Sequence, residues 1–151
     1  MDTVIDRIKS VLTEDPPEYR ERLRRIAEII RTARGYQWLC LYEVNTGGVE
    51  ALTWSPEEEP PAHPRFPVTE GLCGAVVNSA ETLVVSDVAK DARYLTTLGS
   101  TRSEAVVPIR RVPLAPILGL IDAASERADS FTDEDRAFLE QCSAILAQVC
   151  R

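Results

Sequence analysis

The sequence has little histidine and no paired cysteine motif, and these shortages exclude the common metal sites. His63 is the only histidine among 151 residues, and the four cysteines contain no Cys-x-x-Cys pair. Structural zinc sites use closely spaced cysteine and histidine ligands, so neither a metal nor a cofactor is expected. No disulfide framework is indicated either, which favours reduced thiols in a cytoplasmic protein.

Long apolar runs and an excess of positive charge are also missing. No stretch approaches the roughly 20 apolar residues that cross a membrane, and the opening MDTVIDRIKS lacks the apolar segment of a signal peptide. The formal net charge is −7, which would repel nucleic-acid phosphates. The sequence therefore predicts a cytoplasmic protein that binds neither nucleic acid nor membrane.

What the chain contains is typical of one globular domain. Its residues are 44% hydrophobic and 27% charged, and 151 residues suit a single full core. We divide the chain into an N-terminal amphipathic helix at residues 1–15 and a single domain at residues 16–151. The apolar stripe of that first helix consists of Val4, Ile5, Ile8, Val11 and Leu12. So short a helix must bury its stripe elsewhere, which predicts a homodimer through the terminal helices.

Two longer helices are predicted near the ends of the domain. The first runs from residue 16 to 34, with Asp15 as its cap, Pro16 at its first position and Gly35 after its end. The last helix begins at Thr132, where Asp135 three residues later completes a capping box.

Between these helices the apolar period changes to two, which is typical of strands. WLCLYEV (38–44) and VEALTW (49–54) flank the turn NTGG and predict a hairpin, and EAVVPI (104–109) and ILGLIDAAS (117–125) predict another. On the first strand Trp38, Cys40 and Tyr42 share one face. A further strand (82–88) and a short helix (70–80, capped by Thr69) lie between the hairpins.

Helices at both ends of a set of hairpins predict an α+β fold. We expect a central, mostly antiparallel sheet with the N- and C-terminal helices on one face. The other face would be covered by residues 55–102, a loop and helix roof over a pocket, which is a natural place for a small-molecule site. Residues 55–67, SPEEEPPAHPRFP, are predicted to be an extended surface loop.

The motifs GLCGAVV, LVVSDVAKDARY, STRSEAVVPI, LGLIDAAS and FTDEDRAFLE, in this order, resemble GAF domains. The resemblance covers the chain from about residue 20 to its end. The closest subgroup is that of the free methionine-(R)-sulfoxide reductases, which are lone GAF domains of this size. This resemblance implies a GAF fold and a ligand pocket.

The resemblance also assigns residues to the pocket. Trp38 and Tyr42 match a tryptophan and a tyrosine four apart on the first strand, and Glu104 matches the glutamate of an SE-hydrophobic-VP motif. Asp122 matches the first acid of a D-x-D-S motif, and Cys73 matches the cysteine of GVCG. The ligand-binding residues implied are Trp38, Tyr42, Glu104 and Asp122.

Two positions depart from the subgroup. Alignment on STRSE puts Thr97 where the subgroup has its attacking cysteine, and Ala124 where it has the second acid of D-x-D-S. Reduction of a sulfoxide needs a thiolate to attack sulfur and a second thiol to resolve the intermediate. A threonine hydroxyl can do neither, so these departures favour binding without catalysis.

Each candidate residue also has a structural interpretation. Cys73 lies in the first turn of its helix, where the dipole favours a thiolate, but with its flanking glycines it could simply be small. Trp38 and Tyr42 could be plain core, and Glu104 could be an exposed strand end paired with Arg102. A carboxylate on a strand among small residues, as at Asp122, is more typical of a pocket wall.

The sequence thus favours a stand-alone GAF domain that binds a small molecule as a non-catalytic sensor, passing its signal to another protein. One alternative is a divergent free methionine-(R)-sulfoxide reductase that uses Cys73, with Cys40 as a possible second thiol. Another is a purely structural dimerisation module.

Overall fold

The computed structural model describes residues 3–13 and 18–150 of the chain. The helices are α1 (Val4–Thr13), α2 (Tyr19–Arg34), α3 (Gly71–Ser79) and α4 (Asp133–Leu146), with a 3₁₀ turn η1 (Val88–Lys90). The strands are β1 (Trp38–Asn45), β2 (Gly48–Ser55), β3 (Arg65–Phe66), β4 (Leu83–Val85), β5 (Ser103–Ile109) and β6 (Gly119–Ser125).

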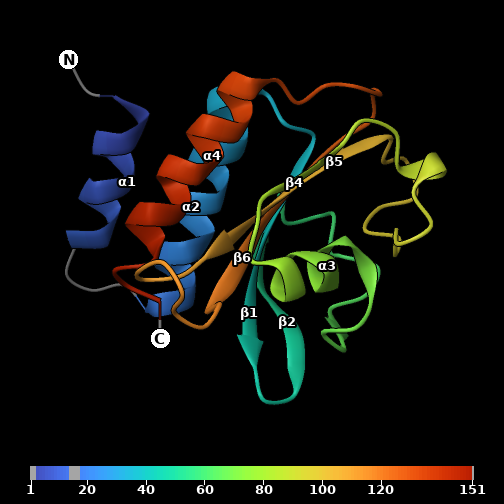
Figure 1. Cartoon of the computed structure of the whole chain (residues 1–151). Helices are drawn as coiled ribbons and strands as arrows, with labels where there is room; N and C mark the ends of the chain where they lie inside the picture. The colour runs from blue at the N-terminus through green and yellow to red at the C-terminus, as the bar shows by residue number, and fades with distance from the viewer. Residues whose placement is uncertain (1–2, 14–17, 151) are drawn as a thin grey trace.

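The six strands form one sheet in the order β3-β2-β1-β6-β5-β4, and every neighbouring pair is antiparallel. Figure 1 shows α2 and α4 on one face of the sheet and α3 with its flanking loops on the other, while α1 lies beyond α2. This confirms the predicted α+β fold, with the terminal helices on a common face.

The alternation of β1 separates two apolar clusters. Leu39 and Leu41 pack with the helices α1, α2 and α4. Trp38, Cys40 and Tyr42 pack on the opposite face, with α3 and the roof. The period of two therefore predicts correctly which side of the sheet each of these residues occupies.

Two helix ends have the capping residues that the sequence predicts. Gly35 takes a left-handed conformation, φ 69°, directly after α2. Thr132 and Asp135 form the expected capping box at α4. The predicted start of the second helix, at Asp15 and Pro16, lies outside the described residues.

Some predicted bounds are wrong. The N-cap of α3 is Glu70, not Thr69, and it has no side-chain cap bond. The Pro-rich segment 55–67 contains β3, which pairs with β2. The strand predicted at 82–88 ends at Val85, because the Asp87 side chain accepts the amide N–H of Ala89 and begins η1.

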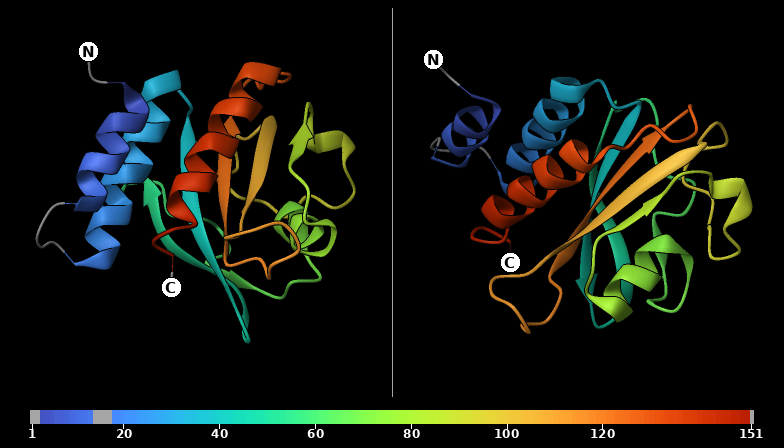
Figure 2. Two further views of the ribbon diagram at one scale, coloured as in Figure 1. Left: turned by 60° about the vertical axis from the view of Figure 1, so that its left-hand side comes forward. Right: turned by 45° about the horizontal axis from the view of Figure 1, so that its top comes forward.

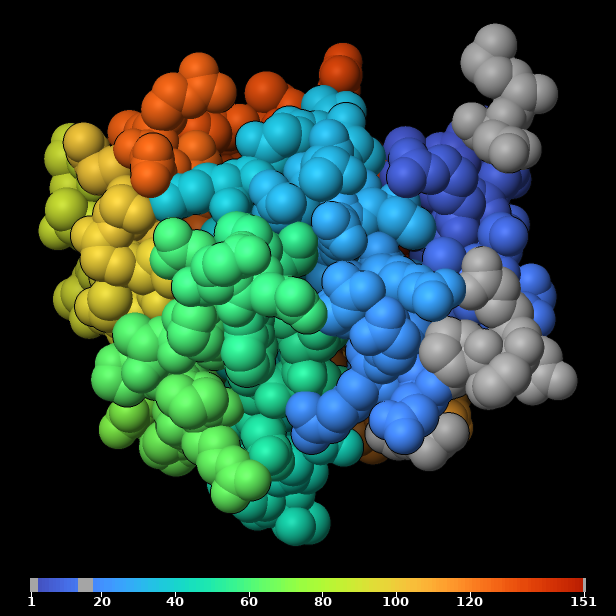
Figure 3. Space-filling view, turned by 180° about the vertical axis from the view of Figure 1, so that it is seen from behind, coloured from blue at the N-terminus to red at the C-terminus, as the bar shows by residue number. Residues whose placement is uncertain are grey.

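The stripe of α1 is covered by the rest of the same chain. Ile8 and Val11 are buried, and Val4, Ile5 and Leu12 pack against the cluster beneath α2 and α4. Figures 2 and 3 show α1 at one edge of the molecule, alongside α2. The dimer stays a prediction, but the stripe no longer requires it.

Candidate functional site

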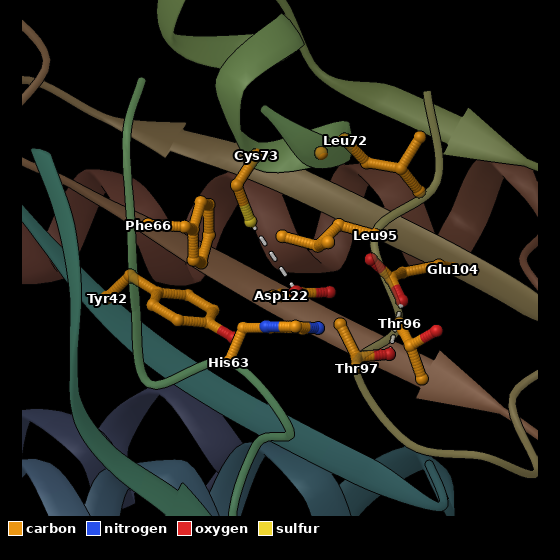
Figure 4. Close-up of a pocket in the computed structure, with 11 residues that line it drawn as sticks. Tyr42, His63, Phe66, Leu72, Cys73, Leu95, Thr96, Thr97, Glu104 and Asp122 are labelled. Atoms are coloured by element: carbon orange, nitrogen blue, oxygen red, sulfur yellow. Dashed lines mark hydrogen bonds between the residues drawn. The ribbon is translucent and has the colours of Figure 1, made fainter. Parts of the chain in front are cut away.

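A small cavity lies between the sheet and the roof of α3 and its neighbouring loops (Figure 4). Its volume is about 10 Å³, which is room for about one water molecule. Its lining residues are Tyr42, His63, Phe66, Gly71, Leu72, Cys73, Leu95, Thr96, Thr97, Glu104 and Asp122. The site is thus closed in this structure, and a ligand could enter only if part of the roof moved.

Strand register brings the two acidic residues of the cavity together. Asp122 on β6 lies opposite Cys40 of β1 and Val106 of β5. Glu104 lies two residues before Val106 on β5, so it occupies the same face at a diagonal position. Both carboxyl groups are withdrawn from solvent, with Glu104 1% exposed and Asp122 0%.

Only some of the carboxyl oxygens of Glu104 and Asp122 accept a hydrogen bond. The Thr97 hydroxyl donates to Glu104 Oε1 at 2.9 Å, and the Cys73 thiol donates to Asp122 Oδ2 with a sulfur–oxygen distance of 3.5 Å. Asp122 Oδ1 is buried and accepts no hydrogen bond from an N–H, hydroxyl or thiol among residues 3–13 and 18–150, so the neighbouring carboxyl group of Glu104, when protonated, is the one donor there that Asp122 has besides Cys73. A buried acceptor without a partner is costly, so this oxygen is the part of the site most in need of a donor.

Burial also sets the protonation of the pair. It raises the pKa of Asp122 to about 7. The pKa of Glu104 is raised well above its usual value, first by burial and then by the negative charge of Asp122. The pair therefore retains at least one proton at neutral pH.

The thiol of Cys73 is not activated in this structure. It occupies the third helical position of α3, where the dipole favours a thiolate, but it is 4% exposed. Burial is the main cause that raises its pKa well above the usual value, and the charge of Asp122 adds to it. Cys40 is buried with a raised pKa for the same two reasons. Both side chains are therefore thiols here.

The glycines of α3 leave space for other segments of the roof, not for the sheet. A Cβ on Gly74 would meet the backbone carbonyl oxygen of Val68 at 2.7 Å, and one on Gly71 would meet Leu95 Cβ at 3.2 Å. Cys73 itself faces the sheet and contacts Asp122. It is neither a plain space filler nor an exposed nucleophile.

The four residues predicted to bind the ligand are on the same face of the sheet, but three of them line the cavity. Tyr42, Glu104 and Asp122 line it, and the Tyr42 ring packs edge-on against Phe66 with centroids 5.6 Å apart. Trp38 is fully buried beside the cavity, and its indole N–H donates to the Glu59 carbonyl at 2.7 Å.

Sequence reasoning missed the residues that the roof contributes, chiefly His63, Phe66 and Leu95. A lone histidine between prolines, in PPAHPR, was the one signal available for them. Thr97, at the position aligned with the attacking cysteine, does line the cavity. Ala124 lies between Trp38 and Glu104 in the register and is fully buried.

Residues 3–13 and 18–150 hold no cluster of three or more histidine, cysteine or acidic side chains suited to a metal ion. None of their helices has the length and apolar character needed to cross a membrane.

Comparison with known proteins gives consistent results. The model of the GAF domain family matches residues 18–150. GAF domain-containing protein A of Dictyostelium discoideum is 25% identical over 145 residues, covering 96% of this chain and 89% of that protein. The free methionine-R-sulfoxide reductase of Saccharomyces cerevisiae is 28% identical over 113 residues, covering 75% of this chain and 62% of the yeast protein. The structure of the Neisseria meningitidis free methionine-R-sulfoxide reductase in complex with its substrate has a TM-score of 0.83 at 26% identity, covering 96% of this chain and 84% of the other.

Proposed function

Because the chain belongs to the GAF domain family, we propose that it binds a small molecule at the Asp122 cavity without converting it, as a sensor or regulatory module. The ligand carries a cationic or hydrogen-bond-donating nitrogen. Tyr42, Glu104 and Asp122 surround that group, and Trp38 supports the roof beside them. The module acts in the cytoplasm and passes its signal to another protein.

The observation that carries this proposal is the unpartnered Asp122 Oδ1. This fully buried oxygen has lost its water, and the protein offers it no N–H or hydroxyl donor apart from the carboxyl group of Glu104. A ligand N–H would supply the missing donor, and an ammonium group would also neutralise the charge. The site therefore favours a donor over an anion or a purely apolar ligand.

The binding test uses L-methionine and free L-methionine-(R)-sulfoxide as probes, since two of the similar proteins are named for the sulfoxide. Calorimetric titration of wild type should detect at least one of them. Asp122→Asn should weaken that binding about tenfold or more, because a charge-assisted hydrogen bond is lost. The matched control is Asp129→Asn, an exposed aspartate outside the cavity, which should bind as wild type does. Unchanged affinity in Asp122→Asn would assign Asp122 a structural role.

The enzyme alternative keeps one observation in its favour, the contact of the Cys73 thiol with Asp122 inside the cavity. Against it, Thr97 takes the aligned place of the attacking cysteine and the thiols of Cys40 and Cys73 have raised pKa values. We expect no appreciable reduction of L-methionine-(R)-sulfoxide with excess dithiothreitol. Turnover in wild type that disappears in Cys73→Ser would reverse this conclusion and make the protein a reductase.

The division at residues 1–15 and 16–151 and the homodimer through the terminal helices are parts of the same proposal. A dimer would give the signal a route to a downstream protein. Light scattering at high micromolar concentration tests it, and a monomer there would leave α1 as a purely intramolecular element.

A further inference from the structure

The loop that carries His63 is tied to the rest of the molecule by both tryptophans. Trp38 Nε1 donates to the Glu59 carbonyl at 2.7 Å, and Trp54 Nε1 donates to the Glu57 carbonyl at 3.1 Å. Trp38 is fully buried and Trp54 half-buried, and the partners of both indole N–H groups are main-chain carbonyls of one loop. The loop therefore has a defined position against the sheet.

Two backbone hydrogen bonds flank His63 itself. The Ala62 N–H donates to the Thr97 carbonyl at 2.9 Å, and the Ala51 N–H donates to the Pro64 carbonyl at 2.8 Å. Pro64 also restricts His63 to extended conformations. The backbone of His63 is thus held between the roof and β2, which places its side chain at the cavity.

The imidazole is available to a ligand. His63 is exposed and lines the same cavity as Asp122, and its ring has no hydrogen bond or ion pair with any residue that the structure describes. In Figure 4 the ring lies on the other side of Asp122 from Cys73 and points toward Thr97. The cavity thus joins a buried acidic end to an exposed imidazole.

These two ends have opposite preferences. The carboxylate of Asp122 accepts hydrogen bonds and attracts a cation. An imidazole N–H donates, and an imidazolium would repel a cation and attract an anion. A ligand that contacts both therefore presents a donor to Asp122 and an acceptor to His63.

We infer that His63 is a specificity-determining ligand contact, which receives an acceptor group such as a carboxylate while Asp122 Oδ1 accepts from the ligand nitrogen. The inference rests on the proposed function and narrows the class of ligand. The ligand class is a small molecule with an amine and a carboxylate, in preference to a simple amine.

The test compares two probes that share the amine and the side chain, L-methionine and its decarboxylated counterpart 3-(methylsulfanyl)propylamine. By calorimetric titration, wild type should prefer L-methionine about tenfold or more, the effect of one charge-assisted hydrogen bond. In His63→Ala the two affinities should approach each other within about twofold, through weaker binding of L-methionine alone. His63→Gln keeps a donor and should restore part of the preference.

The matched control is Arg65→Ala, which removes a neighbouring positive charge that is 78% exposed and does not line the cavity. It should keep the wild-type preference. Equal binding of both probes to wild type, or an unchanged preference in His63→Ala, would overturn the role of His63 and leave the amine site of the proposed function intact. Binding of neither probe to wild type would contradict both.

Discussion

Asp122 combines complete burial, a hydrogen bond from Cys73 and one oxygen without a partner. Burial disfavours the ionised form of this carboxyl group, and this raises its pKa. Its pKa is about 7 when folded, against 3.8 for the ordinary side chain. Folding stability is therefore linked to the titration of this one residue.

The sign of this linkage gives a prediction. The stabilising effect of protonated Asp122 is fully present below about pH 4 and is lost as the pH rises through about 7. In that window the free energy of unfolding should fall by a few kcal/mol at most, since each pKa unit corresponds to about 1.4 kcal/mol. Urea unfolding at intervals of one pH unit measures it.

Asp122→Asn is the informative variant for this measurement, because the amide cannot ionise. Its stability should depend less on pH over the same window, and Asp129→Asn should retain the wild-type slope. An equally steep profile in Asp122→Asn would show that another group, such as the neighbouring Glu104, determines the slope.

At the scale of elements, the pairing of β1 and β6 depends on one glycine. A Cβ on Gly119 would lie 2.4 Å from the Tyr42 backbone oxygen, so an alanine there must push the two central strands apart. Gly119→Ala should lower the free energy of unfolding by about 1–3 kcal/mol, the usual cost of overpacking. Because Tyr42 lines the cavity, binding of the amino-acid probe should weaken as well.

Gly99→Ala is the matched control for this change, since a Cβ there would meet no atom within 4 Å. Its stability should stay within about 0.5 kcal/mol of wild type, as measured by urea unfolding. A similar loss in both variants would mean that glycine content, not the approach of the two strands, explains the effect.

Local rules explain which elements could be predicted from the sequence. The alternation of β1 and the capping box at Thr132 each depend on residues within one element. The direction of the Trp38 indole N–H could not be predicted in this way. Alternation places a side chain on a face, but the partner of that N–H is a carbonyl 21 residues along the chain.

The roof was the least predictable part for the same reason. β3 has only two residues, and nothing in a Pro-rich segment distinguishes it from a loop. The positions of His63 and Leu95 depend on long-range contacts rather than on local propensity.

At the scale of the whole molecule, measurements of stability can show whether α1 completes the core of its own chain or forms an interface with a second chain. Ile8 is fully buried within one chain. Ile8→Ala should therefore lower the free energy of unfolding by about 2–5 kcal/mol, the usual cost of such a truncation in a core. Lys9→Ala, on the exposed side of α1, should have little effect.

The dependence of the unfolding midpoint on protein concentration shows whether Ile8 stabilises a single chain or a dimer. If α1 only completes the core of its own chain, the unfolding midpoint of wild type and Ile8→Ala should not change with concentration. A midpoint that rises with concentration in wild type would show that association contributes to stability, as the predicted homodimer requires.

The two indole tethers of the His63 loop have a spectroscopic consequence. The chain has only two tryptophans, and both donate their N–H to carbonyls of the segment that must stay in place for His63 to face the cavity. Any displacement of that segment breaks or lengthens one of these bonds and changes the surroundings of an indole. Intrinsic fluorescence, with no added label, therefore reports on movement of this part of the roof, and Trp54→Phe leaves Trp38 as the single emitter nearest the site.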